Sequence, residues 1–443
     1  MKKKVVVVGG GWAGLAAALA LVERGVEVQL FEKRAILGGR AYSYRAREAG
    51  HAVDNGQHLL MGCYRATLGL LERIGARDRI EIQPRLSVPF LHPERGAATF
   101  RCAIAPSPLH LVLGAIGYRH LTPGERWRLV SGGLKIALRY RGRSNHTVSY
   151  ALRETRQSEN LLTSFWNPLA IAVLNELPER ASAELFAEVL RRVFFARPAA
   201  SSIVFPRVGL SDLCAEPSAA AIERLGGVVE TGPAVRSVGV SRERASGVSI
   251  EGRGELRADA VILAVPPPAL GPLLPEALRS APGLAGIDRL RGSPIVSVHF
   301  WFAESFDTPR MAGFLDGPIH WLFTPPMQPE RGRYVTLVVS GAHELVTHPP
   351  EAITQIARRE LERYLPRSRA LHVADSLVVK EPQATYAATP EEQPSRPGPR
   401  TPIANLFLAG DWTDTGLPAT LESAVVSGER AAEAAAAYLS GYA

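Results

Sequence analysis

Residues 4–34 carry the hydrophobic pattern of a strand, a turn, a helix and a second strand. Four valines at positions 5–8 predict a buried strand, and the alanines and leucines of positions 14–24 predict a helix that Gly25 ends. Positions 26–31 then alternate between apolar and polar side chains, as in a second strand. Strand, helix and strand in this order predict the first unit of a parallel sheet.

Three later stretches are expected to add strands to this unit. Residues 226–240 have the pattern of short strands, and residues 257–270, RADAVILAVPPPAL, that of a buried strand ended by prolines. Residues 406–409 predict one more short buried strand. We therefore expect strands from the first 60 residues, the 200–270 region and the last 45 residues to join in one domain.

Between these segments the pattern changes. Residues 64–200 are mostly helical in periodicity, whereas residues 292–340 contain alternating runs that suit an antiparallel sheet. The sequence thus predicts an α/β fold, with a Rossmann-like domain built from discontinuous segments and a second domain of antiparallel sheet plus helices. The predicted boundaries are 1–63, 200–270 and 396–443 for the first domain, and 64–199 and 271–395 for the second. The proline-rich residues 387–402 predict a surface connection.

Length and composition narrow the class of protein. A chain of 443 residues suggests two or three domains, and three widely spaced cysteines predict neither a disulfide framework nor a metal site. We expect a reducing cytoplasm. The basic, apolar start is split by glycines and runs directly into the first strand, so we interpret it as mature protein. No apolar stretch predicts a membrane span.

The net charge of +8 is partly local. Between residues 103 and 145 seven basic residues accompany one acid, Glu125, together with leucines, isoleucines and Trp127. This mixture suits an anionic membrane surface better than a nucleic-acid groove, so we expect no nucleic-acid partner. Two interpretations stay open: peripheral contact with the inner face of the membrane, or a solvated helix face. The basic residues are Arg119, Arg126, Arg128, Lys135, Arg139, Arg141 and Arg143.

Gly9, Gly11 and Gly14 form a GxGxxG turn between the first strand and the helix. The first glycine permits the tight turn, the second lets backbone approach a pyrophosphate, and the third lets helix and strand touch. The helix N-terminus offers amides to phosphates, and Glu32, at the end of the second strand, can accept ribose hydroxyls. This predicts a dinucleotide site and favours FAD or NAD over NADP. Further candidate contacts are Trp12, Ala13 and Lys33.

The GGR motif, Gly38, Gly39 and Arg40, follows the acid closely. Its guanidinium can return to the pyrophosphate as a charge-assisted partner, an arrangement that favours FAD over NAD. The alternative is a simple loop.

The C-terminal segment again has the pattern of a strand followed by a helix. Gly410 and Asp411 break the predicted strand, and a carboxylate there can bond the hydroxyls of a ribitol chain. Thr420 or Pro418 then opens a helix from Leu421, whose N-terminus can stabilise negative charge on a flavin ring. The alternative is a capped helix after a turn.

The three motifs, in this order over the whole chain, resemble the flavin amine oxidase and phytoene desaturase superfamily, which has a GR2-type FAD-binding domain. Three stretches look like the hydroxysqualene dehydroxylases, also described as squalene-associated FAD-dependent desaturases: VDNGQHLLMGCYRATLGLLERIG, FWNPLAIAVLNELPERASAELFAEVL and SSIVFPRVGLSDL. The resemblance implies FAD, a hydrophobic polyprenoid substrate, and reduction of hydroxysqualene to squalene with loss of water in squalene and hopanoid synthesis.

The resemblance carries residue roles only for the cofactor. It assigns FAD positions to Gly9, Gly11, Gly14, Glu32, Gly38, Gly39, Arg40, Gly410 and Asp411. It also implies that backbone at Val235 holds adenine and that Gly56 runs beside the flavin ring. No catalytic acid, electron donor or oligomeric state follows from it.

Residues 53–64, VDNGQHLLMGCY, place four polar side chains at the start of an apolar run. The departing hydroxyl needs a proton, for which Asp54 and His58 are the candidate donors. Gln57 and His58 are also candidate cofactor contacts. Alternatively, these side chains only bond backbone and cofactor.

A C30 substrate requires a long apolar tunnel. Any single aromatic residue is more often core than lining. The candidate lining residues are Phe165, Trp166, Phe300, Trp301, Trp321 and Phe323.

Two other functions are kept as alternatives. A flavin enzyme of this kind could instead desaturate a carotenoid precursor or oxidise an amine. A non-enzymatic protein of the GDP dissociation inhibitor type could bind prenyl lipids with a similar fold, although the intact flavin motifs argue against it.

Overall fold

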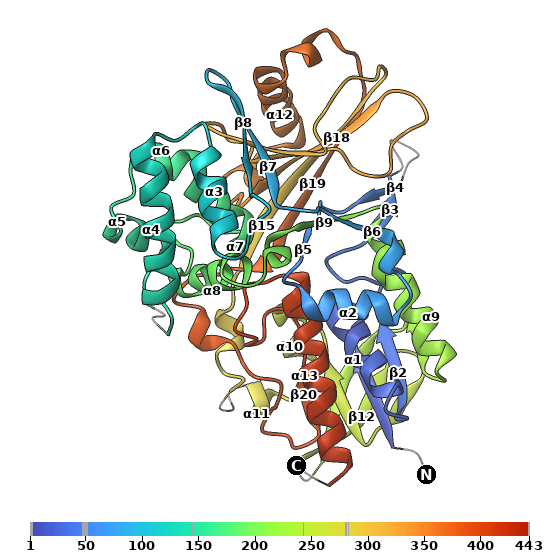
Figure 1. The fold of residues 1–443 in the computed structure, drawn as a ribbon. Helices are drawn as coiled ribbons and strands as arrows, with labels where there is room; N and C mark the ends of the chain where they lie inside the picture. The colour runs from blue at the N-terminus through green and yellow to red at the C-terminus, as the bar shows by residue number, and fades with distance from the viewer. Residues whose placement is uncertain are drawn as a thin grey trace.

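The computed structural model describes residues 3–46, 52–142, 145–241, 243–279, 281 and 283–441. A parallel sheet and a larger mixed sheet organise the chain, so the predicted α/β fold is confirmed. In Figure 1 the helices α1 (Trp12–Val22) and α13 (Leu421–Leu439) lie at the lower end, and α12 (Pro350–Tyr364) lies at the upper end.

The parallel sheet gathers strands from distant parts of the chain. In spatial order they are β10 (Val228–Thr231), β2 (Glu27–Glu32), β1 (Lys4–Val8), β14 (Ala260–Leu263) and β20 (Leu406–Leu408). The central strands β1 and β14 are nearly fully buried, because layers cover both faces of the sheet. This burial is the reason for their uninterrupted apolar runs.

The alternate valines of β1 face two different layers. Val5 and Val7 pack with α1 and α13, whereas Val6 and Val8 belong to the core on the other face. A three-stranded antiparallel sheet contributes to that second core. Its strands are β11 (Val235–Ser241), β12 (Arg244–Ile250) and β13 (Gly254–Arg257).

The mixed sheet has seven strands and lies toward the upper end in Figure 1. In spatial order they are β19 (Val373–Tyr386), β15 (Gly292–Phe302), β18 (Arg333–Ser340), β17 (Trp321–Phe323), β16 (Met311–Phe314), β7 (Ser87–His92) and β8 (Gly96–Arg101). Only β16 and β7 pair in parallel among these strands. One face packs on α12; we call the opposite face the inner face.

A group of helices lies beside β7 and β8, on the left in Figure 1. They include α3 (Leu109–Gly117), α4 (Pro123–Arg139), α5 (Val148–Glu154), α7 (Asn167–Leu174) and α8 (Ala183–Phe194). A small antiparallel sheet links segments of both predicted domains: β9 (Ile203–Pro206) pairs with β5 (Leu60–Met61) and β6 (Ile80–Ile82). Among the described residues, none of the helices combines the length and apolar character of a bilayer-spanning segment.

Residues 64–200 are mostly helical, as predicted, and also contribute β7 and β8, a hairpin that joins the mixed sheet. One expectation needs correction. Residues 387–402 are not simply a surface connection, since Arg396 and several neighbours are buried. The Arg396 guanidinium donates to the carbonyl oxygens of Trp412 and Thr413, at 3.3 and 2.5 Å, and these bonds compensate its burial.

Candidate active site

The GxGxxG turn has the backbone geometry that its glycines predict. Gly9 lies at φ +108°, in the region that favours glycine, and its N–H donates to the Phe31 carbonyl at 2.8 Å. A Cβ on Gly14 would lie 1.9 Å from the Gly9 oxygen. Gly11 is the N-cap of α1, which begins with Trp12 and Ala13. Backbone amides at a helix start can bind an anion, which is the role that the sequence predicts for this one.

Glu32 stands at the end of β2, beside the turn. Its carboxylate is buried and accepts from the Gly10 N–H at 2.8 Å and the Arg34 N–H at 3.0 Å. The N–H of Gly232 donates to the Glu32 carbonyl at 2.8 Å, three residues before Val235 opens β11. This acid beside a glycine turn has the placement of a ribose acceptor. Lys33, in contrast, is exposed.

The GGR loop lies directly against the glycine turn. The Gly38 N–H donates to the Gly10 carbonyl at 2.8 Å, and a Cβ on Gly39 would lie 2.9 Å from the Gly11 Cα. The structure thus brings the first two motifs into backbone contact.

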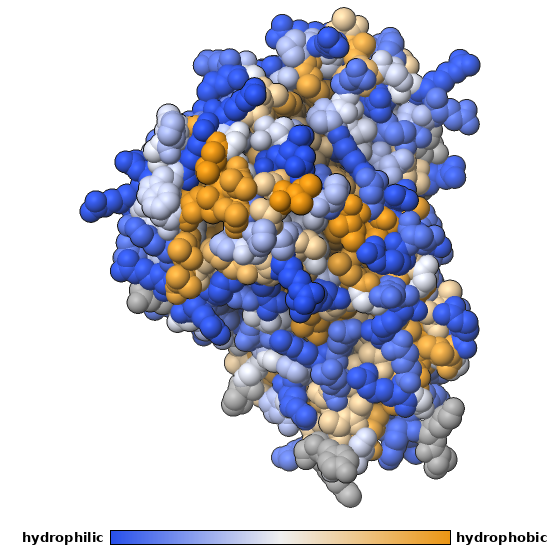
Figure 2. Space-filling view, in the orientation of Figure 1, coloured by the Kyte–Doolittle hydropathy of each residue, from blue (hydrophilic) through white to orange (hydrophobic). Residues whose placement is uncertain are grey.

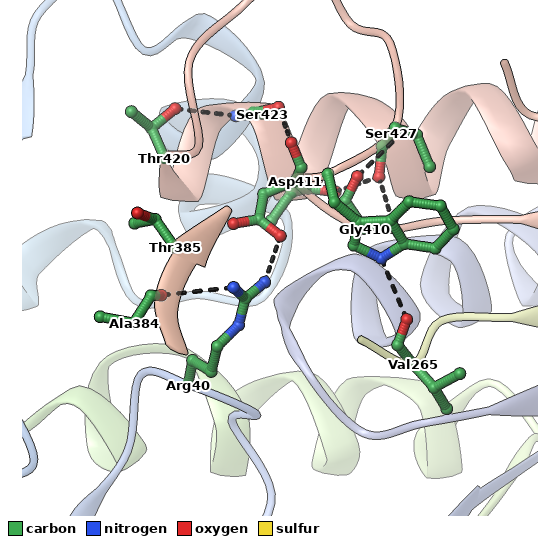
Figure 3. Close-up of polar contacts among 12 residues, drawn as sticks. Arg40, Val265, Ala384, Thr385, Gly410, Asp411, Thr420, Ser423 and Ser427 are labelled. Atoms are coloured by element: carbon green, nitrogen blue, oxygen red, sulfur yellow. Dashed lines mark hydrogen bonds and ion pairs between the residues drawn. The ribbon is translucent and has the colours of Figure 1, made fainter. Parts of the chain in front are cut away.

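Arg40 forms an ion pair with Asp411, which joins the two ends of the chain (Figure 3). A second Arg40 nitrogen donates to the Ala384 carbonyl at 3.3 Å. The Asp411 carbonyl accepts from the Ser423 hydroxyl at 3.2 Å, so the start of α13 holds this loop. Arg40 and Asp411 were each predicted as a cofactor contact; their pairing was not.

The start of α13 is capped by Thr420 rather than Pro418. The Thr420 hydroxyl accepts from the Ser423 N–H at 3.1 Å, and Leu421 is the first helical residue. Gly410 donates its N–H to the Ser427 hydroxyl at 2.6 Å. The strand end therefore lies against the first turns of the helix.

The surroundings of Gly56 fit a planar group that offers hydrogen bonds. A Cβ on Gly56 would meet no protein atom closer than His58 Cε1 at 3.8 Å and Ser297 Oγ at 3.9 Å, so protein packing does not require the glycine. Among the described residues, the buried Gln57 Nε2 and Ser297 Oγ have no hydrogen-bond partner. Buried polar atoms normally have one, so these atoms fit the edge of a bound flavin.

Asp54 is committed to contacts within the protein. One carboxylate oxygen accepts from the Ser43 hydroxyl at 2.7 Å and from the Leu210 N–H at 3.0 Å. Burial raises the pKa of Asp54 to about 6, against the lowering effect of these two bonds. Its neighbour Asn55 donates to the Arg40 carbonyl at 3.0 Å and thereby braces the GGR loop.

His58 is half-buried and points back to its own turn. Its Nδ1 lies 2.9 Å from the Gly56 carbonyl, which can only accept, so Nδ1 carries the proton. Burial lowers the pKa of His58, the bond to Gly56 opposes that shift, and the Arg40 charge lowers it further. The imidazole is therefore neutral at neutral pH.

The inner face of the mixed sheet presents a polar group that the sequence analysis missed. His299 is fully buried, with its Nδ1 2.6 Å from the Tyr334 hydroxyl and 3.2 Å from that of Thr336. Its Nε2 has no partner among the described residues, and burial lowers the His299 pKa to about 3. Trp301 stacks on Tyr334 with ring centroids 4.8 Å apart. The alternation of β15 was the available signal, because His299 follows Ser297 on the same face.

The predicted lining residues separate into three places. Trp321 and Phe323 alternate with Leu322 of the α12 core, so they lie on the inner face. Trp301 is on the same face but packs in a separate cluster with Ala46, Val53 and Tyr334. Phe300 faces the other way and is packed in the core against α12, so it cannot line the same wall.

Phe165 and Trp166 lie among the helices. Phe165 packs against Phe100, with ring centroids 5.1 Å apart, in the core that also contains Trp321. The Trp166 indole donates to Gln157 at 2.9 Å, inside the helical layer.

Comparisons with known proteins identify the family of this chain. The model of the family "Flavin containing amine oxidoreductase" matches residues 12–436. Hydroxysqualene dehydroxylases are 31% identical in Rhodopseudomonas palustris, over 98% of both chains, and 30% identical in Sinorhizobium fredii, over 98% of this chain and 99% of that one. The 15-cis-phytoene desaturase of Synechococcus elongatus is 26% identical over 97% of this chain and 95% of that one.

Solved structures share the fold. An oxidoreductase from Methanosarcina mazei superposes with a TM-score of 0.74 at 18% identity, covering 96% of this chain and 98% of that one. Putrescine oxidase bound to putrescine gives 0.72 at 17% identity, covering 98% of each chain. The protein is thus an oxidoreductase with FAD as its cofactor, and the chain belongs to the flavin-containing amine oxidoreductase family.

Proposed function

We propose that this enzyme reduces hydroxysqualene to squalene with loss of water, as a step of squalene and hopanoid synthesis. The observation that carries the proposal is the similarity to hydroxysqualene dehydroxylases over nearly the whole chain, at 30–31% identity. The inner face of the mixed sheet supports it, since aromatic residues there adjoin buried polar groups.

When bound in reduced form, FAD supplies the hydride that replaces the hydroxyl group. The residues that would hold it are the glycine turn, Glu32, the Arg40–Asp411 pair and the start of α13. Arg40 is the group for phosphate charge, and Glu32 and Asp411 are the acceptors for hydroxyls.

The aromatic residues of the inner face would bind the polyprenoid and exclude water. Loss of an allylic hydroxyl leaves cationic character on the carbon, and a water molecule at that carbon would restore the alcohol. Trp301, Trp321 and Phe323 provide apolar surface that prevents this return.

The departing hydroxyl needs one proton, and three side chains are candidates. Asp54 is already engaged with Ser43 and Leu210, and the neutral His58 uses its N–H for Gly56. His299 joins the two predicted candidates as a proton relay and not as an acid in its own right, because its pKa of about 3 keeps the imidazole neutral. Its Nδ1 lies 2.6 Å from the Tyr334 hydroxyl, and its buried Nε2 is unpartnered within the described residues.

Three variants separate these candidates: Asp54→Asn, His58→Gln and His299→Gln. The donor is the residue whose replacement lowers kcat on hydroxysqualene by about 100-fold or more while FAD content stays stoichiometric. If all three variants keep kcat within about threefold of the parent enzyme, the proton does not come from these side chains.

Anaerobic turnover tests the reaction itself. The reduced enzyme is mixed with hydroxysqualene, and squalene is measured alongside the return of oxidised flavin absorbance. The proposal expects one squalene per flavin oxidised. Reduced enzyme that leaves hydroxysqualene intact, while oxidised enzyme desaturates phytoene, would establish the carotenoid alternative, which the 26% identity to a phytoene desaturase keeps in view.

A further inference from the structure

The outer faces of α3 and α4 expose large apolar side chains. Figure 2 shows hydrophobic residues gathered over this region of the molecule. Trp127 is 71% exposed, Leu138 70% and Ile104, in the segment before α3, 91%. The others are Leu109, Leu113, Ile116 and Leu134. We call these seven residues the α3–α4 surface.

These residues form a line along each helix. At 3.6 residues per turn, Trp127, Leu134 and Leu138 fall within about 20° of one line along α4. Leu109, Leu113 and Ile116 of α3 share one face by the same spacing. Buried residues such as Leu129 and Ile136 occupy the opposite side of α4 and form its contact with the core. The exposed line is therefore a second apolar face of the helix, in addition to the one that packs on the core.

Basic side chains border the apolar line. Arg128, Lys135 and Arg139 follow α4 about 100° around the helix from it, and all three are exposed. Arg139 pairs with Glu154, whereas Arg128 and Lys135 have no acidic partner within the described residues. Arg143, also predicted to belong to this basic group, lies outside the described residues.

The one acid of the segment lies at the helix start, away from the exposed line. Glu125 forms a capping box with Thr122 and accepts from the Asn160 amide at 2.9 Å. The surface therefore combines exposed leucines and a tryptophan with uncompensated positive charge, the composition of an interfacial helix pair.

We propose that the α3–α4 surface docks the enzyme on an anionic phospholipid bilayer. A second copy of this chain is the less favourable occupant, because two such surfaces would bring Arg128 and Lys135 together with their equivalents. A bilayer with anionic headgroups offers apolar depth for Trp127 and Leu138 and opposite charge for the basic border.

The interior beneath this surface leads toward the inner face of the mixed sheet. Tyr118, at the end of α3, packs on Phe90 with ring centroids 5.8 Å apart, and Phe90 packs on Trp321 at 5.9 Å. Docking would hold this apolar side of the enzyme against lipid, where a polyprenoid dissolves. The docking itself does not depend on the proposed reaction, and its readout below is binding.

Trp127 gives a direct signal of docking. Of the six tryptophans, the other five are at most 8% exposed. The holoenzyme is titrated with vesicles of phosphatidylcholine alone or with about 30% phosphatidylglycerol. We expect flotation with the anionic vesicles, a blue shift of tryptophan emission and quenching by brominated acyl chains, all weakened at about 0.5 M salt.

Variants assign the binding to this surface. Trp127→Ser with Leu138→Ser, and Arg128→Glu with Lys135→Glu, should each lower vesicle affinity at least about tenfold. The matched controls replace exposed residues elsewhere: Ile82→Ser with Leu225→Ser, and Arg257→Glu with Arg279→Glu. Trp127→Phe should keep the binding and lose the emission shift.

Three results would overturn the proposal. One is equal vesicle binding by surface and control variants. Another is equal binding to vesicles with and without anionic lipid. The third is a concentration-dependent dimer that the surface variants dissociate, without vesicle binding by the parent enzyme.

Discussion

In the cofactor site the glycine turn and the GGR loop are in direct backbone contact. In the mixed sheet, by contrast, the site is formed by side chains on one face of neighbouring strands. A Cβ on Gly14 would lie 1.9 Å from the Gly9 oxygen, and a Cβ on Gly39 would lie 2.9 Å from the Gly11 Cα, both too close for a side chain. On the inner face, His299 depends on Tyr334 and Thr336 of the neighbouring strand. The first arrangement needs particular residue types at fixed local spacing; the second needs the register of strands distant in sequence.

The largest expected effect is at Gly14. Gly14→Ala would place a methyl group 1.9 Å from the Gly9 oxygen, so the helix and the strand would have to move apart. We expect the unfolding free energy to fall by more than about 4 kcal/mol and FAD binding to be lost. The matched control is Gly69→Ala in α2 (Arg65–Arg73), where a Cβ meets nothing within 4 Å and stability should hold or rise by up to about 1 kcal/mol. Thermal melts and flavin absorbance after gel filtration measure both. A Gly14→Ala enzyme with full FAD would contradict the close contact.

Phe300 tests the two faces of β15. Phe300→Ala empties part of the core against α12 and should lower the unfolding free energy by about 3–4 kcal/mol, with unchanged KM in the enzyme that stays folded. Trp321→Leu, on the inner face, should raise KM with a smaller change in stability. If Phe300→Ala raised KM and Trp321→Leu mainly lowered stability, the assignment of the two residues to opposite faces would be wrong.

Asp54 should make stability depend on pH. Its pKa is raised from 3.8 to about 6 by burial, so the folded state binds more protons than the unfolded state between these values. Stability from this group is therefore present below about pH 4 and is lost as pH rises to about 6, by up to about 3 kcal/mol. Asp54→Asn should remove the contribution of this group to the slope in urea unfolding and leave that of Glu392, whose pKa burial raises to about 7. Asp259→Asn, at an exposed carboxylate, should keep the whole slope.

Arg40 and Asp411 join the motifs of the two chain ends. Arg40→Ala and Asp411→Ala should each weaken FAD binding by about 1–3 kcal/mol, because a charged hydrogen bond is lost. Arg363→Ala, which breaks an exposed ion pair with Asp316, is the control. The measurement is the fraction of FAD that each variant retains after dialysis. Stoichiometric FAD in both variants would reject these roles.

The same contrast explains what the sequence could predict. Gly9, Gly14, Glu32 and the GGR loop follow from local spacing, because each role is a backbone requirement within one strand–turn–helix unit. Phe300 was grouped with Trp301 because aromatic composition ignores that neighbouring strand residues face opposite sides. The alternation of β15 could have shown which face His299 is on, but its partners Tyr334 and Thr336 follow only from the pairing of β15 with β18.

The buried course of residues 387–402 was missed for a related reason. Proline and polar residues predict an exposed connection, but Arg396 finds its partners in the carbonyls after Asp411. Such a match between a side chain and distant backbone cannot be read from local composition.

Gly56 is expected to show the smallest effect. Protein packing requires glycine at Gly14, whereas at Gly56 only a bound flavin would require it. Gly56→Ala should change the stability of the FAD-free protein by less than about 0.5 kcal/mol, since its Cβ would make only ordinary contacts. If the space beside it belongs to the flavin, FAD affinity should still fall, by about 1 kcal/mol, with a shifted flavin spectrum. Titration of FAD into the apoprotein measures this, with Gly69→Ala again as control. Unchanged affinity and spectrum would mean that Gly56 does not adjoin the ring, and the unpartnered Gln57 amide and Ser297 hydroxyl would then need another ligand to satisfy them.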